Sequence, residues 1–371
     1  MSGRTVEHGP GDHRETRMPW PDSVRFTAVT LVVVAHFVER FAQPGDAIDA
    51  FLTGTWALRV PLLVAIAGYF STAELPTERF VRRLLQSVVV VYVVFDLAQR
   101  AQILAITGNL NKELARPVFG MWFLLSLITW RVLLPYLTRV RWFGVLAVVA
   151  SLGVGFTDGI GYGMSLHRTF VFLPFFLLGW WVREVGLRER IATPSVRWVA
   201  AGTLALGLAG GVLARDAVSL RLLRGAESYI YAERFAMLGW RAVSLAAGAA
   251  MVLAVFALVP WRRVPVITYL GSGSMYSYLL HQPVHRQAFH AGLAAHVTTP
   301  AGVALLGLGA VVLSAALSSR PVRAVARPFV QPRWTWFLRD APPSPARYPA
   351  ATAAPPDRHL ALVASRGGTG S

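Results

Sequence analysis

The sequence predicts an all-α, polytopic integral membrane protein with about ten transmembrane helices and both termini in the cytoplasm. The chain of 371 residues is 54% hydrophobic and only 15% charged, whereas soluble domains carry about 25% charged residues. Nearly charge-free runs of about 20 residues, the length that crosses a bilayer, recur along it. Most of the arginines lie in the short segments between these runs or in the tails, which is typical of membrane proteins.

The apolar runs justify the individual helices and divide the chain. Polar residues 1–19 are expected to form a disordered cytoplasmic tail, residues 20–320 the membrane domain, and residues 321–371 a basic, Pro/Ala-rich cytoplasmic tail. Within the membrane domain we expect spans over 24–41, 55–72, 84–106, 118–137, 142–158, 168–184, 197–214, 234–258, 266–284 and 299–318.

The distribution of arginine predicts the orientation, because loops on the cytoplasmic side carry an excess of Lys and Arg. With a cytoplasmic N-terminus, the outer connections 42–54 and 159–167 contain neither Lys nor Arg. The outer segment 215–233 is an exception, since it carries three arginines. On balance the pattern predicts a multi-pass protein of the cell membrane whose inner connections hold Arg79, Arg82, Arg83, Arg139 and Arg141.

Charge and cysteine content exclude several classes of function. The net charge is +17, yet the arginines are spread over loops and tails, so the lipid bilayer rather than nucleic acid is the expected partner. Cysteine is absent, which excludes disulfides and thiolate nucleophiles. His281 and His285 could share a helix face, but no third ligand stands at helical spacing, so we expect no metal. Oligomeric state cannot be predicted.

The first expected helix contains the most informative spacing, in the stretch "RFTAVTLVVVAH". Arg25 and His36 are eleven residues apart, which places them on one helix face about 16 Å apart along the axis. Asp22 and Glu39 extend the same face. Ionisable groups at membrane depth normally face a protein interior or a wet cavity. A histidine can act as a general base there, although a snorkelling Arg25 and a His36 bonded to a neighbouring helix would need no chemistry.

Several stretches, in order, resemble the membrane-bound acyltransferase-3 family. The R-x10-H spacing is similar to the hallmark of its first helix, and "HRTFVFLPFFLLGWWVRE" resembles the fucose 4-O-acetylase-like subgroup. Ala67 replaces the usual serine before Gly68, and Tyr69 replaces a phenylalanine. The other matching stretches are "VPLLVAIAGYF" (60–70), "ERFVRRLLQSVVVVYVVF" (78–95), "GMWFLLSLITWRVLLPYL" (120–137) and "GSGSMYSYLLHQPV" (271–284).

The resemblance implies an O-acyltransferase that moves an acyl group, usually acetyl, from acetyl-CoA to a hydroxyl of a carbohydrate or glycosylated small molecule. His36 would be the general base or a transient acyl carrier. Our own physical interpretation adds Glu39 as the catalytic group that orients His36. Arg25, Arg79, Arg82 and Arg83 would bind the phosphates or thioester end of the donor. The expected acceptor-binding residues are Trp122, Tyr278, His281 and Gln282.

A transporter or flippase of a small molecule or lipid-linked sugar, without acyl chemistry, is the main alternative, since many helices and buried charges also suit a translocation path. The R-x10-H spacing and the absence of an internal repeat favour the enzyme. Each site residue also has a simpler interpretation. Arg79, Arg82 and Arg83 fit plain inside-positive topology, and Trp122 and His281 fit interfacial anchoring.

Overall fold

The computed structural model describes residues 18–109, 113, 115–157, 163–191 and 193–338. All regular structure in these ranges is helical, with no strand. The expected N-terminal tail, except residues 18 and 19, and the expected C-terminal tail beyond residue 338 lie outside the described residues. The chain up to Arg333 forms one compact unit, which is the subject below, and residues 334–338 belong to a second unit.

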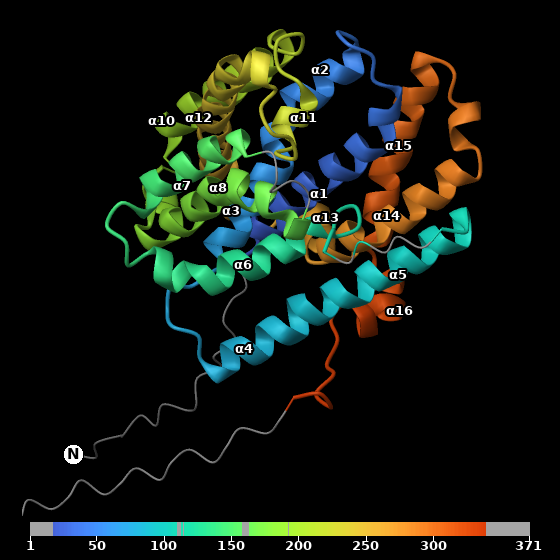
Figure 1. The fold of residues 1–371 in the computed structure, drawn as a ribbon, viewed down its shortest axis with the longest axis horizontal. Coiled ribbons are helices and arrows are strands. Elements are labelled where there is room, and N and C mark those ends of the chain that lie inside the picture. Colours follow the sequence, from blue (N-terminus) through green and yellow to red (C-terminus); the bar gives the residue numbers. More distant parts are fainter. Residues whose placement is uncertain (1–17, 110–112, 114, 158–162, 192, 339–371) are drawn as a thin grey trace, which may run out of the picture. The chain divides into compact units, whose positions relative to one another are not determined.

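The unit is a bundle of helices around α1 (Figure 1). Helix α1 packs against α3, α13, α14 and α15, while α3 runs along α8 and α10 along α12. The α-helices are α1 (Trp20–Val38), α2 (Ala47–Gly54), α3 (Val60–Tyr69), α4 (Glu78–Leu84), α5 (Val90–Thr107), α6 (Trp122–Leu137), α7 (Phe143–Gly153), α8 (Leu166–Glu184), α9 (Leu187–Ile191), α10 (Pro194–Leu213), α11 (Leu220–Leu223), α12 (Arg234–Leu258), α13 (Pro265–Gly271), α14 (Ser274–His290), α15 (Pro300–Leu317) and α16 (Arg320–Val330).

Short turns of tighter or wider helix connect several of these elements. A π-helical segment over Leu85–Val89 joins α4 to α5, so that one helical stretch runs through both. The 3₁₀ turns are Glu39–Phe41, Trp56–Leu58, Val154–Phe156, Gly163–Ser165, Tyr231–Glu233 and Leu293–His296.

Local side-chain chemistry sets where many helices begin and end. Thr77, Thr193 and Thr299 precede α4, α10 and α15, and each hydroxyl accepts a hydrogen bond from the backbone N–H three residues later. This satisfies one of the free donors at a helix start. Helix α5 ends at Gly108, whose φ of 69° lies in the left-handed region that favours glycine.

Two glycines allow the close contact of α3 with α8. A Cβ at Gly68 would lie 1.9 Å from the carbonyl oxygen of Phe176, and one at Gly179 would lie 1.8 Å from that of Ala65. Small residues let helix backbones approach where dispersion contacts rather than water drive association. The pair therefore fixes α8 against α3, and with it one wall of the site described below.

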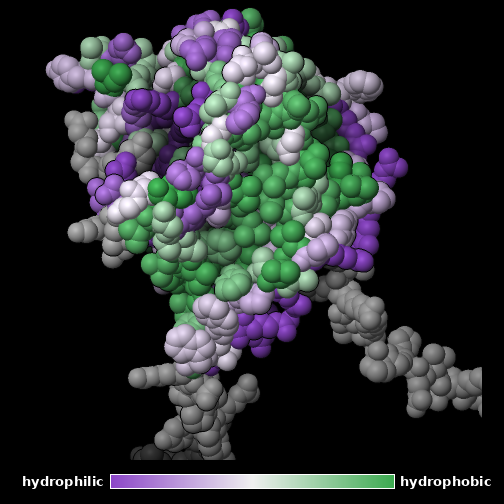
Figure 2. Space-filling model, turned by 90° about the vertical axis from the view of Figure 1, so that its right-hand side faces the viewer, coloured by the Kyte–Doolittle hydropathy of each residue, from purple (hydrophilic) through white to green (hydrophobic). Residues whose placement is uncertain are grey.

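The length and apolar composition of several helices support the prediction of a membrane protein. Among the described residues, five helices are long and apolar enough to cross a bilayer, or six if the bent pair α2–α3 forms one span. Large apolar side chains of α10 and α15, such as Trp198, Leu206 and Leu308, are exposed, as lipid-facing residues would be. On the face drawn in Figure 2, hydrophobic side chains cover the middle and hydrophilic ones lie toward the upper and lower edges. The ten spans and the cytoplasmic termini stay predictions.

Two expected segments differ from the structure. The connection 42–54 contains helix α2, because Asp46 caps it by accepting from Asp49 N at 2.7 Å, and α2 meets the following helix at a 54° bend. The expected span 266–284 is divided at residues 272 and 273 into α13 and α14, and α14 continues to His290. Helix α16 begins at Arg320, where the membrane domain is expected to end, and its Val330 is buried.

Candidate active site

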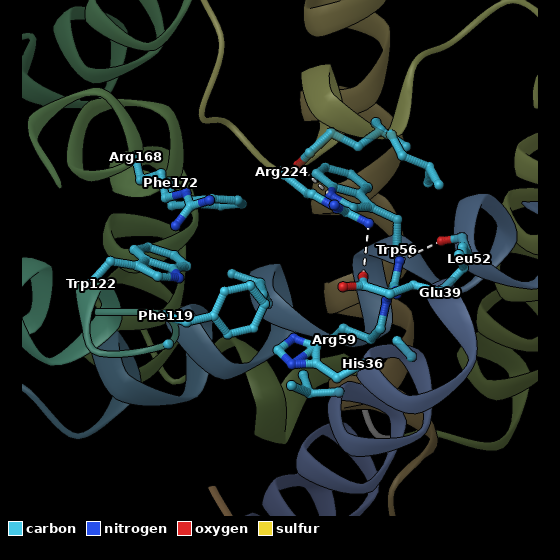
Figure 3. Close-up of a pocket in the computed structure, with 16 residues that line it drawn as sticks. His36, Glu39, Leu52, Trp56, Arg59, Phe119, Trp122, Arg168, Phe172 and Arg224 are labelled. Carbon is cyan, nitrogen blue, oxygen red and sulfur yellow. Dashed lines mark hydrogen bonds and ion pairs between the residues drawn. The ribbon is translucent and has the colours of Figure 1, made fainter. Parts of the chain in front are cut away.

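A cavity of about 140 Å³ lies at the C-terminal end of α1. Its wall combines α1, the bend between α2 and α3, the residues before α6, the first turns of α8, and α11 with the residue after it (Figure 3). His36 lines this cavity and also a smaller one of about 40 Å³, which lies against α14. His36 therefore stands where the two cavities meet.

The His36 ring is held by one hydrogen bond and by ring contacts. Its Nδ1 lies 2.5 Å from Nε2 of Gln282. The ring of Phe119 packs edge-on at 5.0 Å between centroids, and that of His281 at 5.3 Å. No described hydrogen bond uses the other ring nitrogen of His36. Nε2 is therefore the nitrogen available to a bound substrate.

Gln282 and His281 are buried, at 2% and 1% exposure. Nδ1 of His281 donates to the carbonyl of Ser277 at 2.9 Å, which leaves Nε2 of that ring as an acceptor. The Gln282 amide nitrogen lies 2.9 Å from this Nε2. Its two N–H groups can thus serve both imidazoles at once. His281 and Gln282, two of the residues expected to bind the acceptor, thus hold the His36 ring in place.

Tyr278 and Trp122 shape the cavity walls. The hydroxyl of Tyr278 donates to the carbonyl of Gly120 at 2.5 Å, so it fixes the backbone just before α6. Gly120 has a φ of 83°, a conformation that favours glycine. The Trp122 ring lines both cavities, and it stacks on Phe172 at 5.4 Å with Arg168 above it at 5.0 Å. An aromatic face beside polar groups suits a sugar ring.

Glu39 lines the cavity of about 140 Å³ but is paired with an arginine rather than with His36. Its carboxylate accepts from Nη2 of Arg224 at 2.8 Å, and Figure 3 shows this pair beside Arg59. Arg59, in the α2–α3 bend, donates to the carbonyl of Leu52. No described hydrogen bond joins Glu39 to His36. The group that touches the imidazole is the amide of Gln282.

The expected donor-binding arginines lie apart from these cavities. Arg25 shares the face of α1 with His36 but lines neither cavity; it lies 3.6 Å from Asp22 and 4.7 Å from the Phe70 ring centroid. On α4, Arg82 bonds Glu78 at 2.9 Å, whereas Arg79 and Arg83 are exposed. None of the three lines the cavities around His36. The structure therefore gathers the acceptor-side residues around His36 and leaves the donor-side arginines at a distance.

Sequence reasoning missed Phe119, Arg59 and Arg224 as site residues. Arg224 had a signal in the sequence, because segment 215–233 is the exception to the expected distribution of arginine. The structure places the middle of this segment, including Arg224, in the wall of the cavity. Arg168 had a weaker one, as a charge at the edge of an apolar run. Phe119 and Arg59 had none. In the described part of the chain, no group of three or more His, Cys, Asp or Glu side chains could hold a metal ion.

Comparison with known proteins gives one match. A family model described as an acyltransferase domain covers residues 18–319. That range contains every helix lining the two cavities. No curated protein and no solved structure matches the chain.

Proposed function

The chain belongs to the acyltransferase-3 family, and from that premise we propose that it is an integral-membrane O-acyltransferase of the cell membrane. It transfers an acyl group, most simply acetyl, from acyl-CoA to a hydroxyl of a carbohydrate or glycosylated compound. The observation that carries this proposal is the position of His36, whose Nε2 is the unbonded ring nitrogen at the junction of two cavities.

In the proposed reaction, His36 Nε2 accepts the proton of the acceptor hydroxyl as its oxygen attacks the thioester carbonyl carbon. The C–S bond then breaks, and the leaving thiolate takes the proton from the imidazolium, which releases CoA as the free thiol. In the alternative route, Nε2 itself attacks the thioester carbonyl carbon and the C–S bond breaks, which releases the CoA thiolate and leaves an acyl-imidazolium. The acceptor hydroxyl then attacks the acyl carbon, the C–N bond breaks, and the hydroxyl proton passes to the thiolate. Both routes require a lone pair on Nε2.

The orientation of the Gln282 side-chain amide determines which ring nitrogen of His36 carries the proton. When the amide N–H donates to Nδ1, the neutral ring carries its proton on Nε2. A half-turn of the amide presents the carbonyl oxygen instead, which accepts from an Nδ1 that holds the proton. Because this oxygen also faces Nε2 of His281, the state requires a proton on that nitrogen of His281 as well. The His36 ring is then a base at Nε2. Gln282 is thus proposed as a positioning residue for the proton on His36.

The two substrates are proposed to approach from opposite ends of α1. Arg25 and the α4 arginines Arg79, Arg82 and Arg83 would attract the phosphates of acetyl-CoA at the cytoplasmic end. Trp122 and Tyr278 would border the acceptor at the other end. The subgroup resembling fucose 4-O-acetylases fits a sugar acceptor, and Trp122 offers the flat apolar surface on which a sugar ring packs.

The test is release of CoA by the purified protein in proteoliposomes with acetyl-CoA and a glycan acceptor. His36→Ala should abolish release, while His296→Ala, which changes an exposed histidine outside both cavities, should leave it intact. Undiminished turnover in His36→Ala would refute the role of His36. A protein that moves a labelled sugar across the bilayer without releasing CoA would be the alternative transporter. Mass spectrometry of cell glycans with and without the protein would identify the acceptor.

A further inference from the structure

A third, larger cavity of about 900 Å³ opens beside His36 at the same end of α1. Segments that are distant in sequence line it: the 3₁₀ turn after α1, helix α5, the residues before α6, the first turn of α8, α11 with the residues after it, and the last turns of α14. We call it the arginine vestibule, because its wall includes Arg40, Arg116, Arg168, Arg221, Arg224 and Arg286.

Positive charge exceeds negative charge in the vestibule, although Arg224 and Arg116 pair with carboxylates just outside it, those of Glu39 and Glu113. Glu227 is the only acidic residue among those lining it, and it pairs with Arg221 at 3.1 Å. Arg286 donates to two neutral amides, Gln102 at 2.6 Å and Gln99 at 3.0 Å. Arg40 lies over the Phe289 ring at 5.4 Å. Within the described chain, neither Arg40 nor Arg286 has a carboxylate partner, so their charge is left for a ligand.

The vestibule adjoins the two cavities that His36 lines, and it shares wall residues with each of them. Phe119, Arg168 and Arg224 line both it and the cavity shown in Figure 3. Gln282 lines both it and the small cavity, and its amide contacts His36. A ligand in the vestibule is therefore separated from His36 by the thickness of one side chain.

We propose that the arginine vestibule binds the acceptor through phosphate or carboxylate groups, so that the enzyme acylates an acidic carbohydrate. This inference rests on the proposed acyl transfer. Guanidinium groups bind both anions by paired, charge-assisted hydrogen bonds. The phosphates of CoA carry the same chemistry, but a long pantetheine arm separates them from the thioester. A vestibule next to His36 instead suits a compact molecule whose anionic group lies close to its reacting hydroxyl.

The arginines of segment 215–233 then have a function. Arg221 and Arg224 depart from the inside-positive pattern, and both line the vestibule. In the predicted topology this segment and the ends of α1 and α14 face outward. The vestibule would collect an acidic glycan or its precursor at that face, with long-range attraction that weakens as salt rises.

Binding to the full-length protein in nanodiscs of neutral lipid tests the proposal. The probes are tetragalacturonate and glucose 1-phosphate, with maltotetraose as the neutral control. We expect at least one anionic probe to bind about tenfold more tightly than maltotetraose, and its affinity to fall with added NaCl. Equal binding of charged and neutral probes would overturn the proposal.

Variants locate the site and separate the two sources of phosphate. Arg40→Gln should weaken the anionic probe about tenfold, Arg40→Lys should restore most of the affinity, and Arg262→Gln, an exposed arginine outside the vestibule, should change nothing. Arg286→Gln provides a second test inside the vestibule. CoA binding is measured in parallel. If Arg40→Gln and Arg286→Gln weaken CoA as much as the sugar, the charges serve the donor and the proposal is wrong.

The same preparations separate this inference from the proposed function. Loss of the transferase reaction would show as no CoA release with any acceptor while the anionic probe still binds. Failure of the vestibule proposal would show as CoA release that neutral and acidic acceptors support equally.

Discussion

Gln282 joins two imidazoles: its amide nitrogen lies 2.5 Å from Nδ1 of His36 and 2.9 Å from Nε2 of His281. His281 cannot turn freely, because its own Nδ1 donates to Ser277. The ring of His281 therefore holds the amide, and the amide holds His36. These hydrogen bonds connect α14 to the His36 ring on α1.

Replacing Gln282 tests these hydrogen bonds. Gln282→Leu substitutes a shorter, apolar side chain that cannot hydrogen-bond, and so leaves both imidazoles without their shared partner. We expect kcat to fall about 10–100-fold, the loss that corresponds to roughly 1–3 kcal/mol for an unmade buried hydrogen bond, with the KM for acetyl-CoA unchanged. Steady-state CoA release at saturating acceptor measures it.

Gln282→Glu distinguishes positioning from packing. A carboxylate accepts a hydrogen bond from Nδ1–H of His36 and favours the tautomer that is basic at Nε2, but it faces the lone pair of His281 Nε2 unless that ring gains a proton. We expect activity in this variant to rise as pH is lowered, relative to the unmodified enzyme. An identical pH profile in the two proteins would contradict a role for Gln282 in placing the proton.

Glu39 and Arg224 form an ion pair at 2.8 Å. Because each residue directly follows a helix, the pair holds the end of α11 against the end of α1. If this pair holds segment 215–233 over the cavity, Glu39→Gln and Arg224→Gln should each raise the KM for the acceptor, and the double variant should be no worse than either single one. Because Arg224 is 46% exposed, we expect a coupling of about 0.2–1 kcal/mol.

The same double-mutant cycle tests the sequence-based proposal that Glu39 orients His36. That role requires Glu39→Gln to lower kcat while Arg224→Gln leaves it unchanged. If the two substitutions raise the acceptor KM additively, the ion pair is not the reason for the increase.

The membrane class and the importance of α1 could be predicted, because both depend on local sequence. Runs of apolar residues define helices without reference to the rest of the chain, and the Arg25-to-His36 spacing is fixed by helical geometry. The resemblance of their stretches to a known family singled out Trp122, Tyr278, His281 and Gln282. The structure brings these four to one cavity, and their roles stay predictions.

The bend between α2 and α3 and the placement of Arg59 could not be predicted, since they depend on contacts between distant segments. Helix α2 is eight residues long and includes Asp49, so hydropathy gives it no signal. Arg59 lies at the cavity only because the chain turns at this bend. The pairing of Glu39 with Arg224 spans 185 residues, and no local pattern encodes it. The break before α14 is equally invisible, because Ser272 and Gly273 fit a continuous apolar run.

Close packing of α3 on α8 gives a prediction about stability. Gly68→Ala and Gly179→Ala each place a methyl group within 2 Å of a carbonyl oxygen of the opposite helix. The helices must separate, and overpacking of this kind costs about 1–3 kcal/mol or more. We expect a lower melting temperature in detergent and loss of activity, because α8 carries Phe172 and Arg168.

Gly202→Ala is the matched control, since a Cβ there meets no atom within 4 Å. Alanine is the better helix former, by about 0.5–1 kcal/mol, so this variant should melt at the same temperature or slightly higher. A similar loss in all three variants would mean that backbone flexibility, rather than helix contact, explains the glycines.

Arg188 closes the end of the bundle opposite the vestibule. Its guanidinium lies between two indoles, 4.0 Å from the Trp20 ring and 3.7 Å from that of Trp261, and donates to the carbonyl of Val259 at 2.9 Å. We expect Arg188→Ala to lower stability by about 1–3 kcal/mol, since each cation–π contact contributes roughly 0.5–2 kcal/mol. Arg188→Lys should recover part of this, because an ammonium group cannot stack on both rings.

The pH dependence of that loss follows from the pKa of Arg188, which burial lowers from the ordinary value of an arginine to about 10. A lowered pKa of a base means that the unfolded chain binds more protons between these two values, so the contribution of Arg188 to stability rises with pH there. Below about pH 9 the group is charged in both states. Thermal melts from about pH 6 to about pH 9 should therefore show a constant difference between Arg188→Ala and the unmodified protein. A difference that varies over this range would assign the effect to another group.

Orientation in the membrane can be measured directly, because the chain contains no cysteine and any introduced thiol is the sole label site. Gln43 precedes α2 and Ser195 lies at the start of α10, and both are exposed. With a cytoplasmic N-terminus, the positive-inside rule places Gln43 outside and Ser195 inside. A membrane-impermeant maleimide added to intact cells should label Gln43→Cys and spare Ser195→Cys, and permeabilised cells should label both. The reverse pattern would invert the protein and place the arginine vestibule in the cytoplasm, where acetyl-CoA is available. Labelling of both in intact cells would mean that the two positions lie on the same face and that the count of about ten spans is wrong.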